Sequence, residues 1–305
     1  MASPPYTSRA SGVFWITSLH ADEVGLSNRV AEDLETFLVS QSYGFDKRVP
    51  ANAGDFLDML NQLSIHGANG GRRILHLDMH GSQSDGLQIA ATGEFIPWVR
   101  VMDALRRVNI AVKNNLVVVS TACSSAHILS ALGSLTGWQK APFFALVAPP
   151  KDIEASIVAD HVLQFYQDVI NNGDLSKAHR DNLGKELAFF SCERMLFDIL
   201  VSYAATQCIG KAGKARRERL VTALRKQQPN IKEEDLKIYR QGITEAMDLD
   251  HPFTRKQVRQ FLFDREIPFP MSRVMEKAKE RLSEQHRLKV KEDQKIKAMR
   301  RGRKG

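Results

Sequence analysis

Short runs dominated by apolar, β-forming residues constrain the fold of this chain most. They read VFWITSL at residues 13–19, LVVVS at 116–120 and PFFALVA at 142–148. A strand that is apolar along its whole length has both faces buried, as the strands of a helix-covered parallel sheet do. Segments with helical spacing separate these runs. The sequence therefore predicts an α/β fold, a three-layer α/β/α sandwich with a mainly parallel sheet.

Further elements of this sandwich follow from the same patterns. A fourth run, RILHLDM at 73–79, is read as a strand that ends at His80-Gly81, and two strand-like runs at 86–90 and 94–98 flank Ala-Thr-Gly, which is typical of a hairpin. Residues 44–51 are expected to form a loop. The expected helices lie at 22–41, 55–63, 99–113, 125–132 and 154–170.

The C-terminal third is expected to be entirely helical, because strand signals end at about residue 187. The expected helices lie at 187–208, 216–226, 233–247, 254–264 and 272–297, with prolines between several of them. The predicted organisation is a disordered lead-in at 1–12, an α/β domain at 13–190, a helical domain at 191–271, and a charged helix with a basic tail at 272–305.

Composition excludes several classes of protein. No apolar run approaches the ~18–20 residues that span a bilayer, so no membrane association is expected. The start, MASPPYTSRASG, lacks the features of a signal peptide, and three cysteines make no disulfide framework, so a cytoplasmic location is predicted. No Cys or His pair has zinc-site spacing and no phosphate-binding glycine loop occurs, so no metal or other cofactor is predicted.

Charge is concentrated at the C-terminal end. The net charge is +8, and residues 273–305 hold 13 Lys and Arg against 5 Asp and Glu, whereas the other 272 residues carry 30 of each sign. The basic tail is thus a candidate nucleic-acid-binding segment, with the expected helices near 254–265 and 272–282 as a helix-turn-helix-like pair. The alternative is a solvated helix with a frayed end.

A histidine and a cysteine follow two of the predicted buried strands. His80 follows the run at 73–79, and Cys123 follows the run at 116–120. The carboxyl ends of parallel strands share one edge of a sheet, so neighbouring strands would bring the imidazole and the thiol together. A thiol becomes a useful nucleophile beside such a base. Gly81 permits close approach of a substrate, and its N–H with that of Cys123 would stabilise an oxyanion.

The segments DMHGSQSDGLQI, LVVVSTACSSA and FFALVAPPKDIEASIVADHVLQFYQDVINNGDLSKA resemble the caspase–hemoglobinase fold in order and spacing. This superfamily includes caspases, metacaspases, legumain, gingipains, separase and the bacterial CHAT peptidases, and the resemblance covers roughly residues 11–190. It implies that Cys123 forms an acyl-enzyme, that His80 polarises the scissile carbonyl and protonates the leaving amine, and that Gly81 contributes to the oxyanion hole.

The residue two positions before the cysteine departs from these families. Caspases have Gln there, legumain Glu and metacaspases Asp, whereas this chain has Thr121. That position often lines the pocket for the residue on the acyl side of the cut. Asp85 and Asp152 are the candidate acids for a pocket that accepts basic residues, and the hairpin at 86–98 is a candidate side of the substrate groove.

Other readings of single residues stay open. His127 and His20 are alternative bases, His76 is expected to be packed or hydrogen-bonded within its strand, and Cys192 and Cys208 are expected in the core. The string TACSSA also resembles the nucleophile loop of β-ketoacyl synthases, but those enzymes need two downstream histidines in His-Gly-Thr and Gly-His contexts, which this chain lacks.

The resulting functional hypothesis is an intracellular cysteine endopeptidase that cleaves a protein substrate. A free peptidase must be restrained, so regulation by the helical C-terminal region or by a protein partner is expected. Bacterial peptidases of this kind often belong to defence or cell-death systems, which makes such a role plausible by resemblance. The alternative is a catalytically inactive caspase-like scaffold that binds partners.

Overall fold

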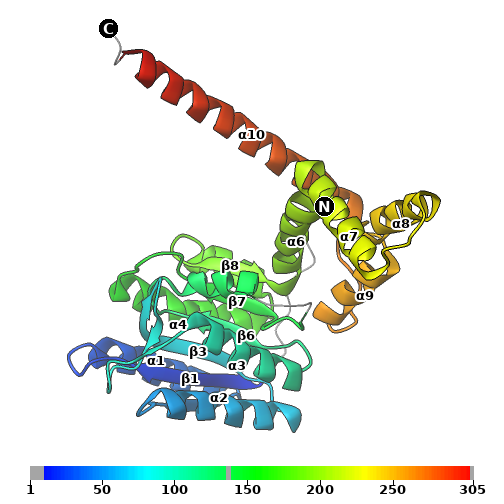
Figure 1. The fold of residues 1–305 in the computed structure, drawn as a ribbon. Helices are drawn as coiled ribbons and strands as arrows, with labels where there is room; N and C mark the ends of the chain where they lie inside the picture. Colours follow the sequence, from blue (N-terminus) through cyan, green and yellow to red (C-terminus); the bar gives the residue numbers. More distant parts are fainter. Residues whose placement is uncertain (1–9, 135–138, 303–305) are drawn as a thin grey trace. The chain divides into compact units, whose positions relative to one another are not determined.

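A computed structural model describes residues 10–134 and 139–302 of the chain (Figure 1). The chain divides into two compact units, Met1–Cys192 and Glu193–Gly305. Residues 1–9 of the expected lead-in and 303–305 of the basic tail lie outside the described residues. Each unit is described by itself below.

The N-terminal unit contains a mixed, mainly parallel sheet. Its main path runs β2-β1-β3-β6-β7-β8; the first five strands are parallel, and β8 is antiparallel to β7. β4 and β5 form a hairpin that pairs with the end of β3. The strands are β1 Gly12–Ser18, β2 Gly44–Arg48, β3 Ile74–Ser82, β4 Gly86–Gln88, β5 Phe95–Ile96, β6 Val117–Ser120, β7 Ala145–Ala148 and β8 Ala188–Ser191.

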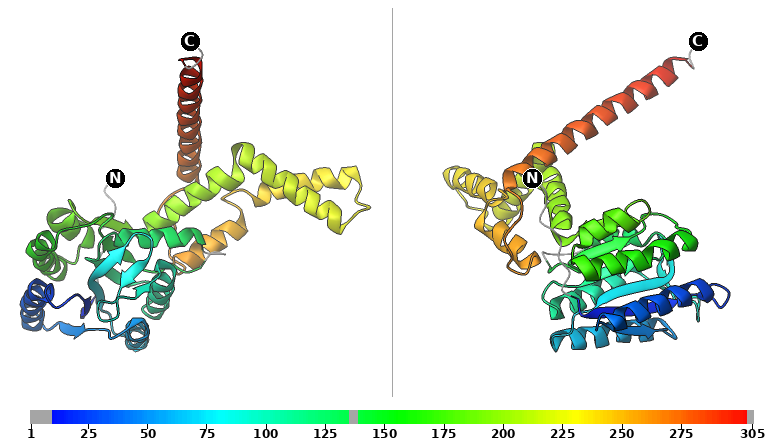
Figure 2. Two further views of the ribbon diagram at one scale, coloured as in Figure 1. Left: turned by 60° about the vertical axis from the view of Figure 1, so that its left-hand side comes forward. Right: turned by 180° about the vertical axis from the view of Figure 1, so that it is seen from behind.

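Helices cover both faces of this sheet, which confirms the predicted three-layer sandwich. Helix α1 packs beside α4, and α2 packs beside α3 on the other face (Figure 2). The helices of this unit are α1 Val24–Ser40, α2 Ala53–Ala68, α3 Trp98–Ala111, α4 Ala155–Asn172 and the short α5 Leu175–Ala178. A 3₁₀ helix η1 (Ser125–Ser134) and a π-helical turn η2 (His179–Leu183) complete it.

The core of the unit lies on both sides of the central strands. Every residue of β1, β6 and β7 is buried, as their apolar sequences predict. From the helices, Leu34 and Leu38 of α1, Phe56 of α2 and Phe165 of α4 are fully buried against them. Burial of large apolar side chains of this kind contributes about 1.5–3 kcal/mol each.

Two strands were predicted wrongly, and both lie at an edge of the sheet. β2 (GFDKR) was expected to be a loop, because an edge strand needs no apolar run and its charged residues remain partly exposed. β8 (AFFS) was expected to be helical, because a four-residue strand directly before helix α6 is too short to show a period of its own. The segment expected to begin a helix at residue 125 is the 3₁₀ helix η1.

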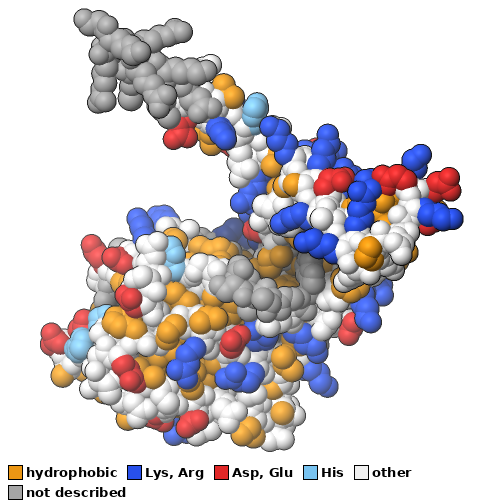
Figure 3. Space-filling view, in the orientation of Figure 1, with side chains coloured by type: hydrophobic (Ala, Val, Ile, Leu, Met, Phe, Trp, Pro, Cys, Tyr) orange, Lys and Arg blue, Asp and Glu red, His pale blue; other side chains and the backbone are white. Residues whose placement is uncertain are grey.

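The C-terminal unit is helical throughout its described part, as predicted. Its helices are α6 Cys192–Tyr203, which begins at the unit boundary, the π-helical η3 Ala204–Cys208, α7 Gly210–Gln227, α8 Glu233–Ala246, α9 Pro252–Phe261 and α10 Met271–Gly302. Its core includes Leu196, Leu200, Val221, Leu236, Val258, Leu262 and Val274. Lys and Arg side chains are spread over its surface (Figure 3). No described helix combines the length and the apolar character that crossing a membrane requires.

Candidate active site

The strand ends that precede Cys123 and contain His80 are neighbours in the sheet. β3 and β6 are parallel with Leu77 opposite Ser120, and the backbone N–H of Thr121 donates to the carbonyl of Leu77 over 2.9 Å. A Cβ added to Gly81 would lie 2.3 Å from the carbonyl oxygen of Cys123. The backbone at Gly81 therefore lies directly against the cysteine loop, and only glycine permits this approach.

His80 lies within β3 rather than after it, because β3 extends three residues beyond the predicted end. There it pairs with Gln88 of β4 in the hairpin. Its Nε2 lies 2.7 Å from Oε2 of Glu23. A carboxylate only accepts hydrogen bonds, so Nε2 carries the proton and Nδ1 the lone pair. Within the described residues Nδ1 has no partner, so it is free to accept a proton.

Glu23 is fixed at the start of α1 by a tight turn. The backbone N–H of His20 donates to its Oε2 over 3.0 Å, and its own N–H donates to the carbonyl of His20 over 2.9 Å. Burial acts to raise the pKa of Glu23, but the hydrogen bonds from His80 and His20 and the charges of both imidazoles outweigh it and hold the pKa below its ordinary value. Glu23 is therefore ionised at neutral pH.

Cys123 lies in the turn between β6 and η1 and is partly exposed. Its thiol donates to the carbonyl of Ile153 over 3.8 Å, and its backbone N–H has no partner within the described part of the chain. Ser124 has a φ of 55°, a strained conformation for a non-glycine residue. The Ser124 hydroxyl donates to Asp152 over 3.1 Å, and its N–H donates to the carbonyl of Lys151, so the 151–153 loop holds this turn.

A cavity of about 370 Å³ opens between α1, α4 and this edge of the sheet. Cys123, His80 and Glu23 line it, as does Thr121. Most of the remaining described lining is apolar: Leu19, Leu26, Val30, Met79, Ile153 and Val162. The cavity thus combines a thiol, an imidazole and a carboxylate with an apolar space large enough for an amino-acid side chain.

Asp78 is a buried carboxyl group that lines the same cavity. It accepts hydrogen bonds from the hydroxyls of Thr121 over 3.1 Å and Thr17 over 3.5 Å, and a very short one from Ser27. Burial raises the pKa of Asp78, against the lowering effect of these hydroxyls and of the Lys47 charge. Asp78 therefore connects β1, α1 and the segment between β6 and Cys123.

His76 also lines the cavity, and it is packed and hydrogen-bonded as predicted. Its ring stacks on Trp15 with centroids 3.6 Å apart, and Nδ1 lies 2.9 Å from the hydroxyl of Tyr166. Complete burial lowers the pKa of His76 to about 3, so the ring is neutral at physiological pH. Neither its Nε2 nor the indole N–H of Trp15 has a partner among the described atoms.

Other candidate residues lie outside the described cavity lining. Asp85 is exposed in the β3–β4 turn, where hydrogen bonds from Ser82 and Ser84 lower its pKa. Asp152 accepts a hydrogen bond from the Ser124 hydroxyl, and neither acid belongs to the described cavity lining. His127 lies in η1, away from that lining, and His20 lies beside Glu23 and His80.

The other two cysteines are not part of the described cavity lining. Cys192 is buried at the end of β8, where the Asn114 amide lies 3.6 Å from its sulfur. Cys208 is half-buried in the C-terminal unit, and burial raises the pKa of its thiol, against the lowering effect of Arg216 and a hydrogen bond from Tyr203. Cys192 thus fits the expected core position, whereas Cys208 is only partly covered.

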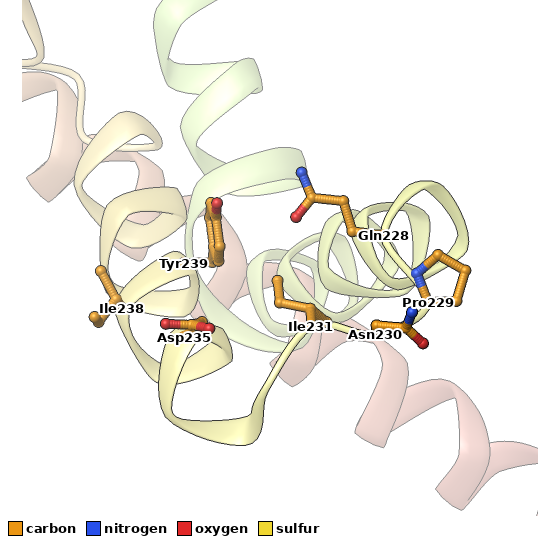
Figure 4. Close-up of a pocket in the computed structure, with 7 residues that line it drawn as sticks. All are labelled: Gln228, Pro229, Asn230, Ile231, Asp235, Ile238 and Tyr239. Atoms are coloured by element: carbon orange, nitrogen blue, oxygen red, sulfur yellow. The ribbon is translucent and has the colours of Figure 1, made fainter.

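The C-terminal unit has a hollow of about 690 Å³ between the end of α7 and α8 (Figure 4). Its described lining is Gln228, Pro229, Asn230, Ile231, Asp235, Ile238 and Tyr239. This lining includes neither a thiol nor an imidazole. The cavity at the sheet edge is therefore the candidate active site.

Sequence reasoning missed three of the residues that form this site. Glu23 is the residue before α1, Ser27 lies in α1, and Asp78 lies in the interior of β3. One local signal could have found Glu23. It lies three residues after His20, and both residues follow β1, the strand adjacent to β3. No protein-family model matches this chain, and no curated protein matches it.

Proposed function

We propose that this protein is a cysteine endopeptidase in which Cys123 is the nucleophile and His80 the general base and acid. The observation that carries the proposal is that both side chains line one cavity at the carboxyl edge of the parallel strands, and that Glu23 is hydrogen-bonded to His80 and orients its ring. A nucleophile beside a base that is itself oriented by a third group is the arrangement that nucleophilic catalysis requires.

The proposed reaction uses the free atoms of this site. Nδ1 of His80 takes the proton of the Cys123 thiol, and the sulfur attacks the scissile carbonyl carbon. The N–H of Cys123, which has no partner among the described residues, and the N–H of Gly81 stabilise the resulting oxyanion. The imidazolium then gives its proton to the leaving amine, and a thioester remains. His80 then takes a proton from the water that attacks the thioester, and the carbon–sulfur bond breaks. The imidazolium returns this proton to the sulfur, which restores the thiol and releases the acid.

The cavity is proposed to hold the substrate side chain on the acyl side of the cut. Thr121, the residue that the family resemblance points to, lines it and donates to Asp78. An apolar space that contains a buried carboxyl group suits a long aliphatic side chain with a cationic end, such as Lys or Arg. Asp78 therefore replaces Asp85 and Asp152 as the acid proposed for specificity.

A peptide-library cleavage profile tests both parts of the proposal. We expect cleavage after Lys or Arg, its abolition in Cys123→Ala, and a preferential loss of Lys and Arg over Leu in Asp78→Asn. Asp85→Asn is the matched control for Asp78→Asn and should leave the profile unchanged. Unaltered cleavage by Cys123→Ala would reject Cys123 as the nucleophile, and an unaltered profile in Asp78→Asn would reject the specificity assignment.

The alternative is an inactive scaffold that uses the same fold to bind partners. A thiol-reactive peptide probe separates the two readings, because only an activated thiol reacts quickly at neutral pH. We expect rapid labelling of Cys123 that is lost in His80→Ala. Equal labelling rates in both proteins would favour the scaffold.

The C-terminal unit is proposed to regulate the site, directly or through a protein partner. A cytoplasmic location and a role in bacterial defence or cell death belong to the same proposal and rest on cysteine usage and on the family resemblance. Its basic tail makes nucleic acid a second candidate partner. Binding of DNA or RNA that weakens steeply with salt would support this role, whereas absent or salt-insensitive binding would exclude it.

A further inference from the structure

We propose that His20, Glu23 and His80 form a binding site for a divalent metal ion of the zinc class. One ligand atom from each residue lies within 4.8 Å of the other two. Imidazole nitrogen and carboxylate oxygen are ligands that Zn²⁺ accepts, and three protein ligands leave one position open to water.

The distances within this cluster are close to those of a bound site. Nε2 of His80 and Oε2 of Glu23 are 2.7 Å apart, and the rings of His20 and His80 have centroids 5.4 Å apart. Ligands that are ~2.0–2.1 Å from a tetrahedral ion lie about 3.3 Å from each other. Side-chain rotations alone can reach this spacing, because all three residues are at least partly exposed.

The backbone holds the three ligands before any ion binds. His20 and Glu23 belong to one turn closed by two hydrogen bonds, and that turn directly follows β1. β1 pairs with β3 in parallel, with Ser18 opposite Met79, so the turn lies beside His80. Because the ligands stand on neighbouring strand ends, binding requires little ordering of the chain.

The site is open to ions from solvent. The side chains of His80 and Glu23 are 34% and 40% exposed. Cys123 does not belong to the cluster, so the proposed ion binds without the thiol.

Metal binding at this site would switch off the proposed peptidase, a consequence that rests on the proposed function. The ion would occupy Nε2 of His80 and draw Glu23 away from its hydrogen bond. An imidazole that binds the ion through Nε2 keeps its one proton on Nδ1, where no lone pair then remains. Nδ1 would then fail to take the proton from Cys123.

Metal binding is measured in the Cys123→Ala protein, so the result does not depend on peptidase activity. Calorimetry with Zn²⁺ and visible absorption with Co²⁺ should give one ion per chain. His20→Ala and Glu23→Gln should weaken binding at least tenfold, and His161→Ala, an exposed histidine of α4, is the matched control. Equal affinity in His20→Ala and the parent protein, or binding that requires Cys123, would overturn the proposal.

A second measurement tests the regulatory consequence in the protein that retains Cys123. With each protein's rate in the presence of a chelator as its own reference, His20→Ala should need at least tenfold more Zn²⁺ for half-inhibition than the parent. Equal Zn²⁺ sensitivity would overturn the inhibitory role. If the metal-free parent cleaves nothing, the peptidase proposal fails while the calorimetric result still decides the metal site.

Discussion

At the scale of single residues, the carboxylate of Glu23 determines the tautomer of His80. Because Oε2 of Glu23 accepts the proton on Nε2, the lone pair remains on Nδ1. The same carboxylate would stabilise the imidazolium that forms when Cys123 is deprotonated. A third residue that orients a catalytic imidazole affects kcat more than substrate binding.

Glu23→Gln should therefore lower kcat roughly 10–100-fold and leave KM nearly unchanged, because the imidazolium loses its counter-charge. Steady-state kinetics on a fluorogenic peptide measure this split. Thermal melting serves as the control for folding. A rise in KM with kcat retained would assign Glu23 to substrate binding instead.

Buried His76 makes the N-terminal unit sensitive to acid. The unfolded chain binds a proton on this imidazole below about pH 6.5, whereas the folded protein leaves it neutral down to about pH 3. The contribution of His76 to the free energy of unfolding is therefore fully present above pH 6.5 and is lost as pH falls towards 3. The full loss is on the order of 5 kcal/mol.

His76→Phe should flatten this pH dependence and cost about 1–3 kcal/mol at neutral pH, since Tyr166 loses its partner. Urea unfolding at pH 7 and pH 4.5, followed by tryptophan fluorescence, measures both effects, because all three tryptophans lie in the N-terminal unit. His161→Phe is the exposed control. If the free energy of unfolding of His76→Phe fell between pH 7 and pH 4.5 by as much as that of the parent, another group would be responsible for the pH dependence.

At the scale of elements, the extension of β3 places His80 and Gly81 beside the turn that carries Cys123. β3 leaves its parallel partners and continues along β4, so Gly81 faces the carbonyl of Cys123. This contact joins Gly81 of β3 to Cys123, 42 positions further along the chain, and it fixes the turn that carries the proposed nucleophile. Any side chain at Gly81 must displace that turn.

Gly81→Ala should thus lower kcat/KM at least 100-fold, because its Cβ would lie 2.3 Å from the Cys123 oxygen. Gly25→Ala is the matched control. Gly25 lies in helix α1, and a Cβ added there has no atom within 4 Å. The rate at which the thiol-reactive probe labels Cys123 reports on the site, and circular dichroism checks that the variant is folded. Full activity of Gly81→Ala would contradict the described contact.

At the scale of the whole molecule, the chain consists of two compact units that join at Cys192 and Glu193. β8 immediately precedes this junction and covers the edge of β7 in four residue pairs. The backbone N–H of Cys192 then donates to the carbonyl of Phe144 over 2.9 Å. The sheet is therefore complete only when the chain continues through residue 192.

A fragment of residues 1–192 should fold and retain the labelling of Cys123, whereas residues 1–187 should aggregate, because the edge of β7 and its apolar residues would be exposed. Size-exclusion chromatography and thermal melting compare the two fragments. Faster labelling of the 1–192 fragment than of the full chain would support restraint of the site by the C-terminal unit. A soluble, cooperatively melting 1–187 fragment would contradict the role given to β8.

The amino-acid sequence was enough to predict the sandwich, the helical C-terminal region and the placement of Cys123 shortly after a buried strand, but it ended β3 three residues early, and His80 lies within that strand. These features follow from the local period of apolar residues, which records burial along each segment. Only the tertiary structure brought Glu23, His20 and Asp78 to the same edge. Glu23 contacts His80 across 57 positions, and the order β1-β3-β6, which no local pattern encodes, creates that contact. The edge strands β2 and β8 likewise form because they pair with β1 and β7. Their residues are partly exposed, so no apolar run marks these strands in the sequence.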